Sequence, residues 1–126
     1  MCEMNTSDEK KLLGMIGLCR KCGRLIIGVP MICEYLAQKK NLSEDEFLVI
    51  EASDVSDNTH KRLSDKCNFY KVKKTKIFSD CNTLGAAIGK GAVAAVAVTG
   101  RDMCRAVADR ISAEAYSLHK SGKERS

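Results

Sequence analysis

Four short β-like runs alternate with segments of helical character along this chain, and that alternation constrains the fold more than any other feature. The runs read RLIIG, EFLVIEAS, YKVKKTKIF and AVAAVAVT. Polar turn signals bound each run, which favours short buried strands over pieces of helix. Because helical segments separate the strands, we predict an α/β/α sandwich around a small, largely parallel or mixed four-stranded sheet.

Two of the four runs differ in a way that predicts their places in the sheet. AVAAVAVT is continuously apolar, as a central strand covered on both faces should be. YKVKKTKIF carries lysines between its apolar residues, which is typical of an edge strand that discourages unwanted pairing. We therefore interpret the lysines first as edge protection and only second as contacts to nucleic acid.

The polar segment at residues 53–58, SDVSDN, follows the run EFLVIEA and raises the choice between a metal site and a helix cap. Ser, Asp and Asn side chains accept hydrogen bonds from the free N–H groups of a first helical turn. A metal site needs converging ligands, and His60 with scattered carboxylates has no recognised ligand spacing. We interpret the segment as a helix cap. Ser79 is expected to cap the next helix, and Thr6 with Glu9 has the spacing of a capping box.

Length and composition place the chain among single-domain proteins that work inside the cell. Its 126 residues fit one domain, which we expect to span 1–118 with a flexible polar tail at 119–126. No apolar stretch approaches the ~20 residues of a membrane span, and the polar start does not look like a signal peptide. The odd count of seven cysteines without an export signal indicates reduced thiols and a cytoplasmic location. The net charge of +5 permits a polyanionic partner.

The sequence CRKC, from Cys19 to Cys22, is the one motif that could hold zinc or a redox pair. No second CxxC or CxxH follows it, so a four-ligand zinc site is incomplete. The motif also falls late in a helical segment, whereas a thioredoxin-type pair sits at the start of a helix after a strand. We favour buried and half-buried thiols here, with a zinc or thiol-redox protein as the weakest of three functional hypotheses.

No catalytic motif is recognisable, and binding is easier to support from the residues. His60 and His119 have no Ser or Cys partner in a nucleophile motif, and no phosphate-loop fingerprint is present. We expect no catalytic residue, no metal, no cofactor and no small-molecule substrate. The start of the helix after Gly28 would attract phosphate through its free N–H groups. A basic rim of Arg20, Lys21 and Arg24 precedes it, although a solvated charged face explains these residues equally well.

Three ordered blocks of the sequence resemble a known family. The blocks are LLGMIGLCRKCGRLIIG, FLVIEASDVSDNTHKRLSDKCNFYKV and LGAAIGKGAVAAVAVT, and together they cover roughly residues 12–105. They resemble the ribosomal protein family of the L-seven-Ae type, especially its small bacterial, ribosome-associated branch. The resemblance implies an α/β/α sandwich that binds RNA at kink-turns, which are sharp bends beside tandem G·A pairs. It also implies service in ribonucleoproteins, with neither catalysis nor a cofactor.

The resemblance carries over to one helix start, where the family has a Gly-Thr-Asn-Glu-x-x-Lys-like motif that contacts the G·A pairs. The glycine is matched by Gly28, and the Thr, Asn, Glu and Lys positions hold Val29, Pro30, Met31 and Glu34. Proline offers no N–H to a phosphate, and Val and Met cannot hydrogen-bond a base edge. A protein-interaction module on the same fold, with weak or no specific RNA binding, is therefore the alternative hypothesis.

Two further segments are implied by the resemblance. The apolar loop that packs on a splayed nucleotide in the family corresponds here to Ile88, Gly89, Lys90, Gly91 and Ala92. The strand-to-helix segment of the bacterial branch is matched by Asp54, Asn58 and Lys61. Phosphate contacts are expected from Arg20, Lys21, Arg24 and Lys90. The expected partner is a ribosomal or other structured RNA, together with ribosomal proteins and without a membrane.

Overall fold

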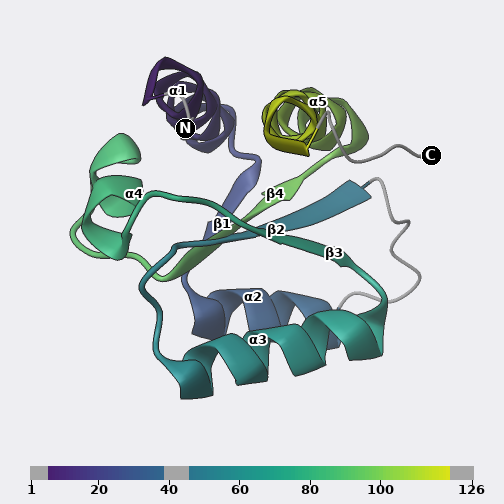
Figure 1. The fold of residues 1–126 in the computed structure, drawn as a ribbon. Helices are drawn as coiled ribbons and strands as arrows, with labels where there is room; N and C mark the ends of the chain where they lie inside the picture. Colours follow the sequence, from purple (N-terminus) through teal and green to yellow (C-terminus); the bar gives the residue numbers. More distant parts are fainter. Residues whose placement is uncertain (1–5, 39–45, 120–126) are drawn as a thin grey trace.

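The predicted three-layer sandwich is confirmed (Figure 1). The computed structural model describes the backbone of residues 6–38 and 46–119, and the side chains of residues 9–38 and 46–110. Helices α1, α4 and α5 pack on one face of the sheet, and α2 with α3 on the other. The elements are α1 (Thr6–Lys21), β1 (Leu25–Ile27), α2 (Val29–Gln38), β2 (Phe47–Glu51), α3 (Asp57–Tyr70), β3 (Lys73–Lys76), α4 (Cys81–Ala87), β4 (Ala95–Thr99) and α5 (Arg101–His119).

The four strands form a mixed sheet in the order β1-β4-β2-β3. Strand β4 is antiparallel to both β1 and β2, and only β2 and β3 are parallel, so the mixed form of the prediction holds and the largely parallel form does not. The physical reason is α4, which has seven residues and a length of about 10 Å. Such a short helix leaves the chain at the end of the sheet where β3 finished, and β4 therefore runs back in the opposite direction.

The predicted places of two strands are confirmed. Every residue of β2 is buried, and β4 is buried except at Thr99, as central strands covered on both faces require. Strand β3 lies at the edge, and its two end residues are exposed while its two middle residues are half-buried. Its lysines therefore line a free sheet edge, which is the arrangement that edge protection predicts.

One end of the sheet gathers four connections that are far apart in sequence. Ile27 of β1 and Ile50 of β2 both pair with Val96 near the start of β4, so β1 and β2 finish where β4 begins. Backbone hydrogen bonds continue this arrangement past the strands, with Gly28 N–H donating to Ala95 and Ala52 N–H donating to Ala94, each at 2.9 Å. We call residues 28–31, 52–58, 77–81 and 88–94 the strand-end face; α2 and α3 start from it on the left in Figure 1.

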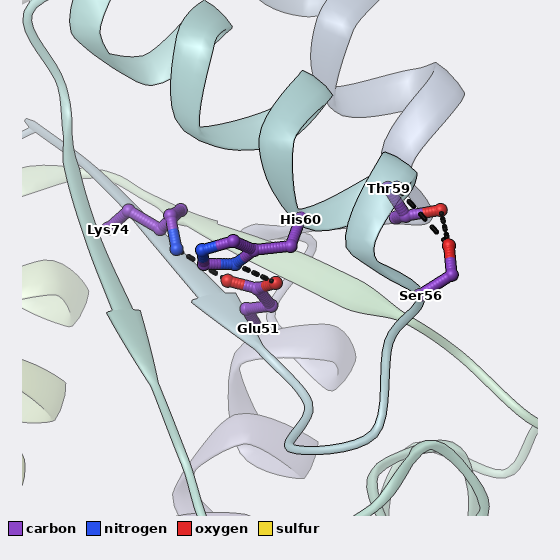
Figure 2. A network of polar contacts seen from close by, with 5 residues as sticks. All are labelled: Glu51, Ser56, Thr59, His60 and Lys74. Carbon is purple, nitrogen blue, oxygen red and sulfur yellow. Dashed lines mark hydrogen bonds and ion pairs between the residues drawn. The ribbon is translucent and has the colours of Figure 1, made fainter.

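The capping interpretation of residues 53–58 is also confirmed. Ser56 is the N-cap of α3, and its hydroxyl oxygen accepts a hydrogen bond from Thr59 N–H at 3.2 Å. The same hydroxyl donates to the Thr59 hydroxyl oxygen at 2.9 Å (Figure 2). The polar segment therefore starts a helix at the strand-end face, and capping explains its polar residues without a metal ion.

Substituting Ser56 with alanine should lower the free energy of unfolding by about 1 kcal/mol, because it removes the acceptor for one free N–H of α3. Urea unfolding of the purified protein measures this difference. Ser53→Ala serves as the control, since the backbone N–H of Ser53, and not its hydroxyl, makes its hydrogen bond to Ser79. Equal losses in the two variants would contradict the assignment of Ser56 as the cap.

The cap expected at Ser79 is wrong. Asp80 is the N-cap of α4, and its Oδ1 accepts from Thr83 N–H at 2.8 Å. Ser79 instead donates both its N–H (3.0 Å) and its hydroxyl (2.6 Å) to Oε2 of Glu9, a buried residue of α1. The carboxylate expected in a local capping box at Glu9 therefore ties α1 to the strand-end face, 70 residues further along the chain.

Two expectations concern a membrane span and the C-terminal tail. No helix among the described residues is long and apolar enough to cross a bilayer. The tail expected at 119–126 begins on the last residue of α5, and 120–126 lie outside the described residues.

Candidate functional site

The strand-end face brings together most of the residues that the resemblance singled out. Gly28 joins β1 to α2 with a φ of +95°, a backbone conformation that favours glycine. Its N–H donates to Ala95, and its C=O accepts from Ile32 N–H at 3.0 Å, so it forms the first intrahelical bond of α2. The first N–H groups of a helix have no intrahelical partners. Pro30 has no N–H, so the free groups at this start are those of Val29 and Met31.

The side chains at the start of α2 present an apolar surface rather than a hydrogen-bonding one. Pro30 is exposed and Met31 is 54% exposed, while Glu34 is exposed and accepts a hydrogen bond from Gln38 at 3.3 Å. Val29 is buried against α3 and the sheet, so its side chain is not available for the contact expected at its position. Contacts here must come from free backbone N–H groups and from the apolar atoms of Pro30 and Met31.

The loop after α4 offers backbone and one cation instead of an apolar side chain. Ile88 is 3% exposed and belongs to the core cluster shared with α1 and α5, so little of its side chain is open to a ligand. Lys90 N–H donates to the Gly85 carbonyl at 2.8 Å, which folds the loop back onto α4. The exposed residues are Gly89, Lys90, Gly91 and Ala92.

A hollow of about 570 Å³ between α1 and α4 joins two parts of the predicted site. A Cβ on Gly89 would lie 3.7 Å from Nη1 of Arg20, so the guanidinium reaches the loop. Gly17 allows this close packing, because a Cβ there would lie 2.9 Å from the Ala87 carbonyl oxygen. The hollow is lined by Gly14, Gly17, Leu18, Arg20, Lys21, Ala87, Ile88 and Gly89.

Arg24, the third member of the predicted basic rim, does not lie beside the start of α2. Its C=O accepts a hydrogen bond from Thr99 N–H at 2.9 Å, and a Cβ on Gly100 would lie 3.0 Å from its Nη1. Both neighbours belong to the end of β4, whereas the strand-end face lies at its beginning. The three residues of β1, about 10 Å of strand, therefore separate Arg24 from the face.

The connection from β2 to α3 contributes polar groups that are partly engaged already. Asp54 is exposed, and its Oδ1 accepts from Cys81 N–H at 2.8 Å. The hydrogen bonds from Cys81 hold the pKa of the Asp54 carboxyl below its ordinary value. Asn58 is exposed, and Lys61 forms an exposed ion pair with Asp65 at 3.1 Å. Such a surface pair breaks easily, so Lys61 remains able to contact a phosphate.

A buried ionic network beneath this connection was missed from the sequence. Glu51, the last residue of β2, has no exposed surface and forms an ion pair with Lys74 of β3. Its Oε2 lies 2.7 Å from Nδ1 of His60, in the first turns of α3 (Figure 2). His60 had no partner recognisable in the sequence, and in the structure it joins α3 to the sheet. The available signal was a carboxylate inside an apolar strand, which requires partners when buried.

The network keeps Glu51 ionised. Burial raises the pKa of its carboxyl, but hydrogen bonds and charges from Lys74 and His60 outweigh burial and hold the pKa below its ordinary value. An ionised carboxylate only accepts hydrogen bonds, so Nδ1 of His60 carries the proton in this contact. The arrangement fixes the start of α3 to two neighbouring strands and supplies no open position for a substrate.

The two cysteines of the CRKC motif do not form a joint site. Cys19 is buried and lies 3.7 Å from the Met103 sulfur, whereas Cys22 is exposed. Burial raises the pKa of the Cys19 thiol, which disfavours the thiolate that metal binding and redox exchange need. Within residues 6–38 and 46–119, no group of three or more His, Cys, Asp or Glu is placed to hold a metal.

The sequence is similar to two bacterial RNA-binding proteins, although no protein-family model matches it. It is 34% identical over 77 residues to RNA-binding protein YlxQ of Enterococcus faecium, covering 61% of this chain and 70% of that protein. It is also 34% identical over 85 residues to RNA-binding protein YlxQ of Bacillus subtilis, covering 68% of this chain and 79% of that protein.

Two solved structures share the fold. A Bacillus halodurans protein of unknown function matches with a TM-score of 0.69 and 27% identity, over 81% of this chain and 97% of that one. A 15.5 kD RNA-binding protein of Giardia lamblia matches with a TM-score of 0.64 over 88% of this chain and 90% of that one. Its identity is 20%, so that likeness is one of fold.

Proposed function

This chain belongs to the family of the RNA-binding protein YlxQ, and we propose on that premise that it binds structured, kink-turn-like RNA through the strand-end face and catalyses no reaction. The observation that carries the proposal is the gathering of three predicted segments at one end of the sheet. They are the start of α2, the loop Gly89–Ala92 and the connection at residues 52–58.

The chemistry of the face suits recognition by shape and backbone. The deep major groove of an RNA duplex hides its base edges, so proteins contact its backbone, its minor groove and its unpaired bases. The free N–H groups at the start of α2 attract phosphate, and the exposed Lys90 and Arg20 supply cations at the loop after α4. Pro30 and Met31 would pack against sugar or base surfaces where the family motif makes hydrogen bonds.

We further propose that the RNA is ribosomal or another structured RNA, and that the protein works in the cytoplasm in association with ribosomes. The net charge of +5 supports a polyanionic partner. Within the proposal the chain acts as a single domain of residues 1–118 and needs no cofactor. Contacts to ribosomal proteins would then use surfaces outside the strand-end face.

A protein-interaction module is the second candidate, and the start of α2 favours it. Met31 is an apolar residue with 54% of its surface exposed there, and Glu34 places a negative charge one turn later. Such a surface suits a protein partner with an apolar contact and a neighbouring cation. Under this candidate Met31→Asp would abolish partner binding, while binding to RNA would be weak and indifferent to sequence.

RNA binding should be measured with a kink-turn RNA and with the same duplex after replacement of its G·A pairs, each over a range of salt. We expect tighter binding to the intact kink-turn. Lys90→Ala should weaken that binding and reduce the slope of log affinity against log salt by about 0.7 to 0.9, the contribution of one phosphate contact.

Arg24→Ala is the matched control, because it removes one exposed cation at the opposite end of β1. It should leave the affinity for the kink-turn nearly unchanged. Equal losses in the Lys90 and Arg24 variants would reduce the proposal to a non-specific basic surface. No binding to either RNA would favour the protein-interaction candidate.

A further inference from the structure

Phe78 is a large aromatic residue that the strand-end face leaves open to solvent. It follows β3 in the connection to α4, and 59% of its surface is exposed. Single exposed apolar residues are common on proteins and need no explanation by themselves. Phe78 differs because the backbone on both sides of it is tied to other elements.

The hydrogen bonds around Phe78 hold it on a fixed base. Ile77 N–H donates to the Glu51 carbonyl at 2.9 Å, and Ser53 N–H donates to the Ser79 carbonyl at 2.9 Å. Ser79 also donates twice to the Glu9 carboxylate on α1. An aromatic ring on a fixed backbone has only two side-chain torsions to order on binding, so its contacts lose little to entropy.

An exposed lysine lies on the sheet edge beside Phe78. Lys76 is exposed on the free edge of β3, two residues before Phe78, and forms no ion pair within the described part of the chain. Of the three carboxylates in the adjacent connections, Asp54 accepts from Cys81 N–H, Asp80 accepts from Thr83 N–H, and Asp57 lies in the first turn of α3. Lysines beside an exposed aromatic ring are the combination that binds unpaired nucleic acid.

We propose that Phe78 is a base-stacking site, on which an unpaired base of the bound RNA stacks while Lys76 contacts a neighbouring phosphate. The inference rests on the proposed function and extends it across the sheet. Phe78 follows β3 at one edge and Gly28 follows β1 at the other, about 14 Å away by the usual spacing of strands. An RNA seated at the start of α2 would have to cross the whole strand-end face to reach the ring.

A tryptophan placed at residue 78 reports stacking directly, because the chain contains no tryptophan of its own. We expect the fluorescence of Phe78→Trp to be quenched by a kink-turn RNA with saturation at the same concentration that a separate binding assay gives. Phe69→Trp is the matched control. Phe69 is 75% exposed in the last turn of α3 and precedes β3, so it lies at the opposite end of the sheet. Its signal should stay constant.

Phe78→Ala should weaken binding by about 5- to 150-fold, the range found when one base loses its aromatic partner. The salt slope should stay at the wild-type value, because a phenyl ring neutralises no phosphate. Phe69→Ala should leave the affinity unchanged. Thermal unfolding of both alanine variants checks that neither loss comes from the fold, and the high exposure of both rings predicts near-wild-type stability.

The outcomes separate this inference from the proposed function. RNA binding by the wild-type protein, with no quenching at residue 78 and full affinity in Phe78→Ala, would overturn the stacking site and leave the RNA-binding proposal standing. Equal quenching at residues 69 and 78 would also overturn it, since that result describes non-specific coating. Absence of any RNA binding by the wild-type protein would overturn both.

Discussion

Glu51→Gln should lower the free energy of unfolding by about 3 kcal/mol at neutral pH. The substitution keeps the size of the side chain and removes its charge, so the mostly buried ammonium of Lys74 loses its counter-charge. Breaking a buried ion pair on one side costs about 3 to 5 kcal/mol, and the hydrogen bonds that an amide can still accept place this variant at the low end. Urea unfolding with a fixed slope measures the change.

Two comparisons make this prediction specific. Asp65→Asn breaks the exposed ion pair with Lys61 on the same helix, and it should cost about 0.5 kcal/mol or less. The double variant Glu51→Leu with Lys74→Met replaces the buried charges by apolar groups and should recover most of the loss. If Glu51→Gln costs no more than Asp65→Asn, the network does not hold α3 to the sheet.

The pH dependence of stability follows from the same network. The folded-state pKa of Glu51 lies below its ordinary value of 4.5, so its ionised form stabilises the fold. This contribution is complete above that ordinary value and is lost as the pH falls through the lower folded-state pKa. Wild-type stability should therefore fall below about pH 4.5, and its advantage over Glu51→Gln should shrink over the same range.

Gly85→Ala should lower the free energy of unfolding by about 2 kcal/mol and weaken RNA binding more than tenfold. A Cβ on Gly85 would overlap the carbonyl oxygen and carbon of Gly91, and both atoms belong to the backbone. The loop at residues 89–92 must move away from α4, and such overpacking outweighs the gain of about 1 kcal/mol in helix propensity. Unfolding in urea and binding to a kink-turn RNA measure the two effects.

Gly14→Ala provides the matched control on another helix. No atom lies within 4 Å of the position that its Cβ would take. This variant should gain up to about 1 kcal/mol of stability from helix propensity. Equal behaviour of the two glycine variants would mean that contact between α4 and the loop does not position the loop for binding.

The fold was largely predictable because the residue composition of each strand indicates whether the strand is buried or at an edge. The apolar run at residues 92–99 predicts a central strand, and the lysines of β3 predict an edge, as the structure has them. The direction of β4 was not decided by these patterns. It depends on α4, which has only seven residues, so the chain is still at the end of the sheet where β3 stops when β4 begins. The length of a helical segment in the sequence does not by itself show at which end of the sheet the next strand begins.

The candidate site was predictable in its segments and less so in its side chains. The start of α2 and the Gly89–Ala92 loop lie at the same end of the sheet, because strand pairing places them there. Arg24 is only four residues from Gly28 in the sequence, but strand β1 lies between them and places them at opposite ends of the sheet. The burial of Ile88 was not predictable, because an apolar residue next to a loop can pack in the core as readily as it can contact a ligand. Partners such as Glu51 and Lys74 lie 23 residues apart and have no local signal.

The position of β4 also decides the order in which the molecule can assemble. Strand β4 lies between β1 and β2, so β1 has no partner strand and β2 has only β3 until residues 95–99 have been synthesised. The parallel pair β2 and β3, with α3 between them in sequence, can form earlier. Until β4 inserts, β1 and β2 offer open edges and apolar faces, which makes the emerging chain prone to aggregation and slow to fold. The insertion of β4 is therefore the step that joins β1 to the rest of the sheet.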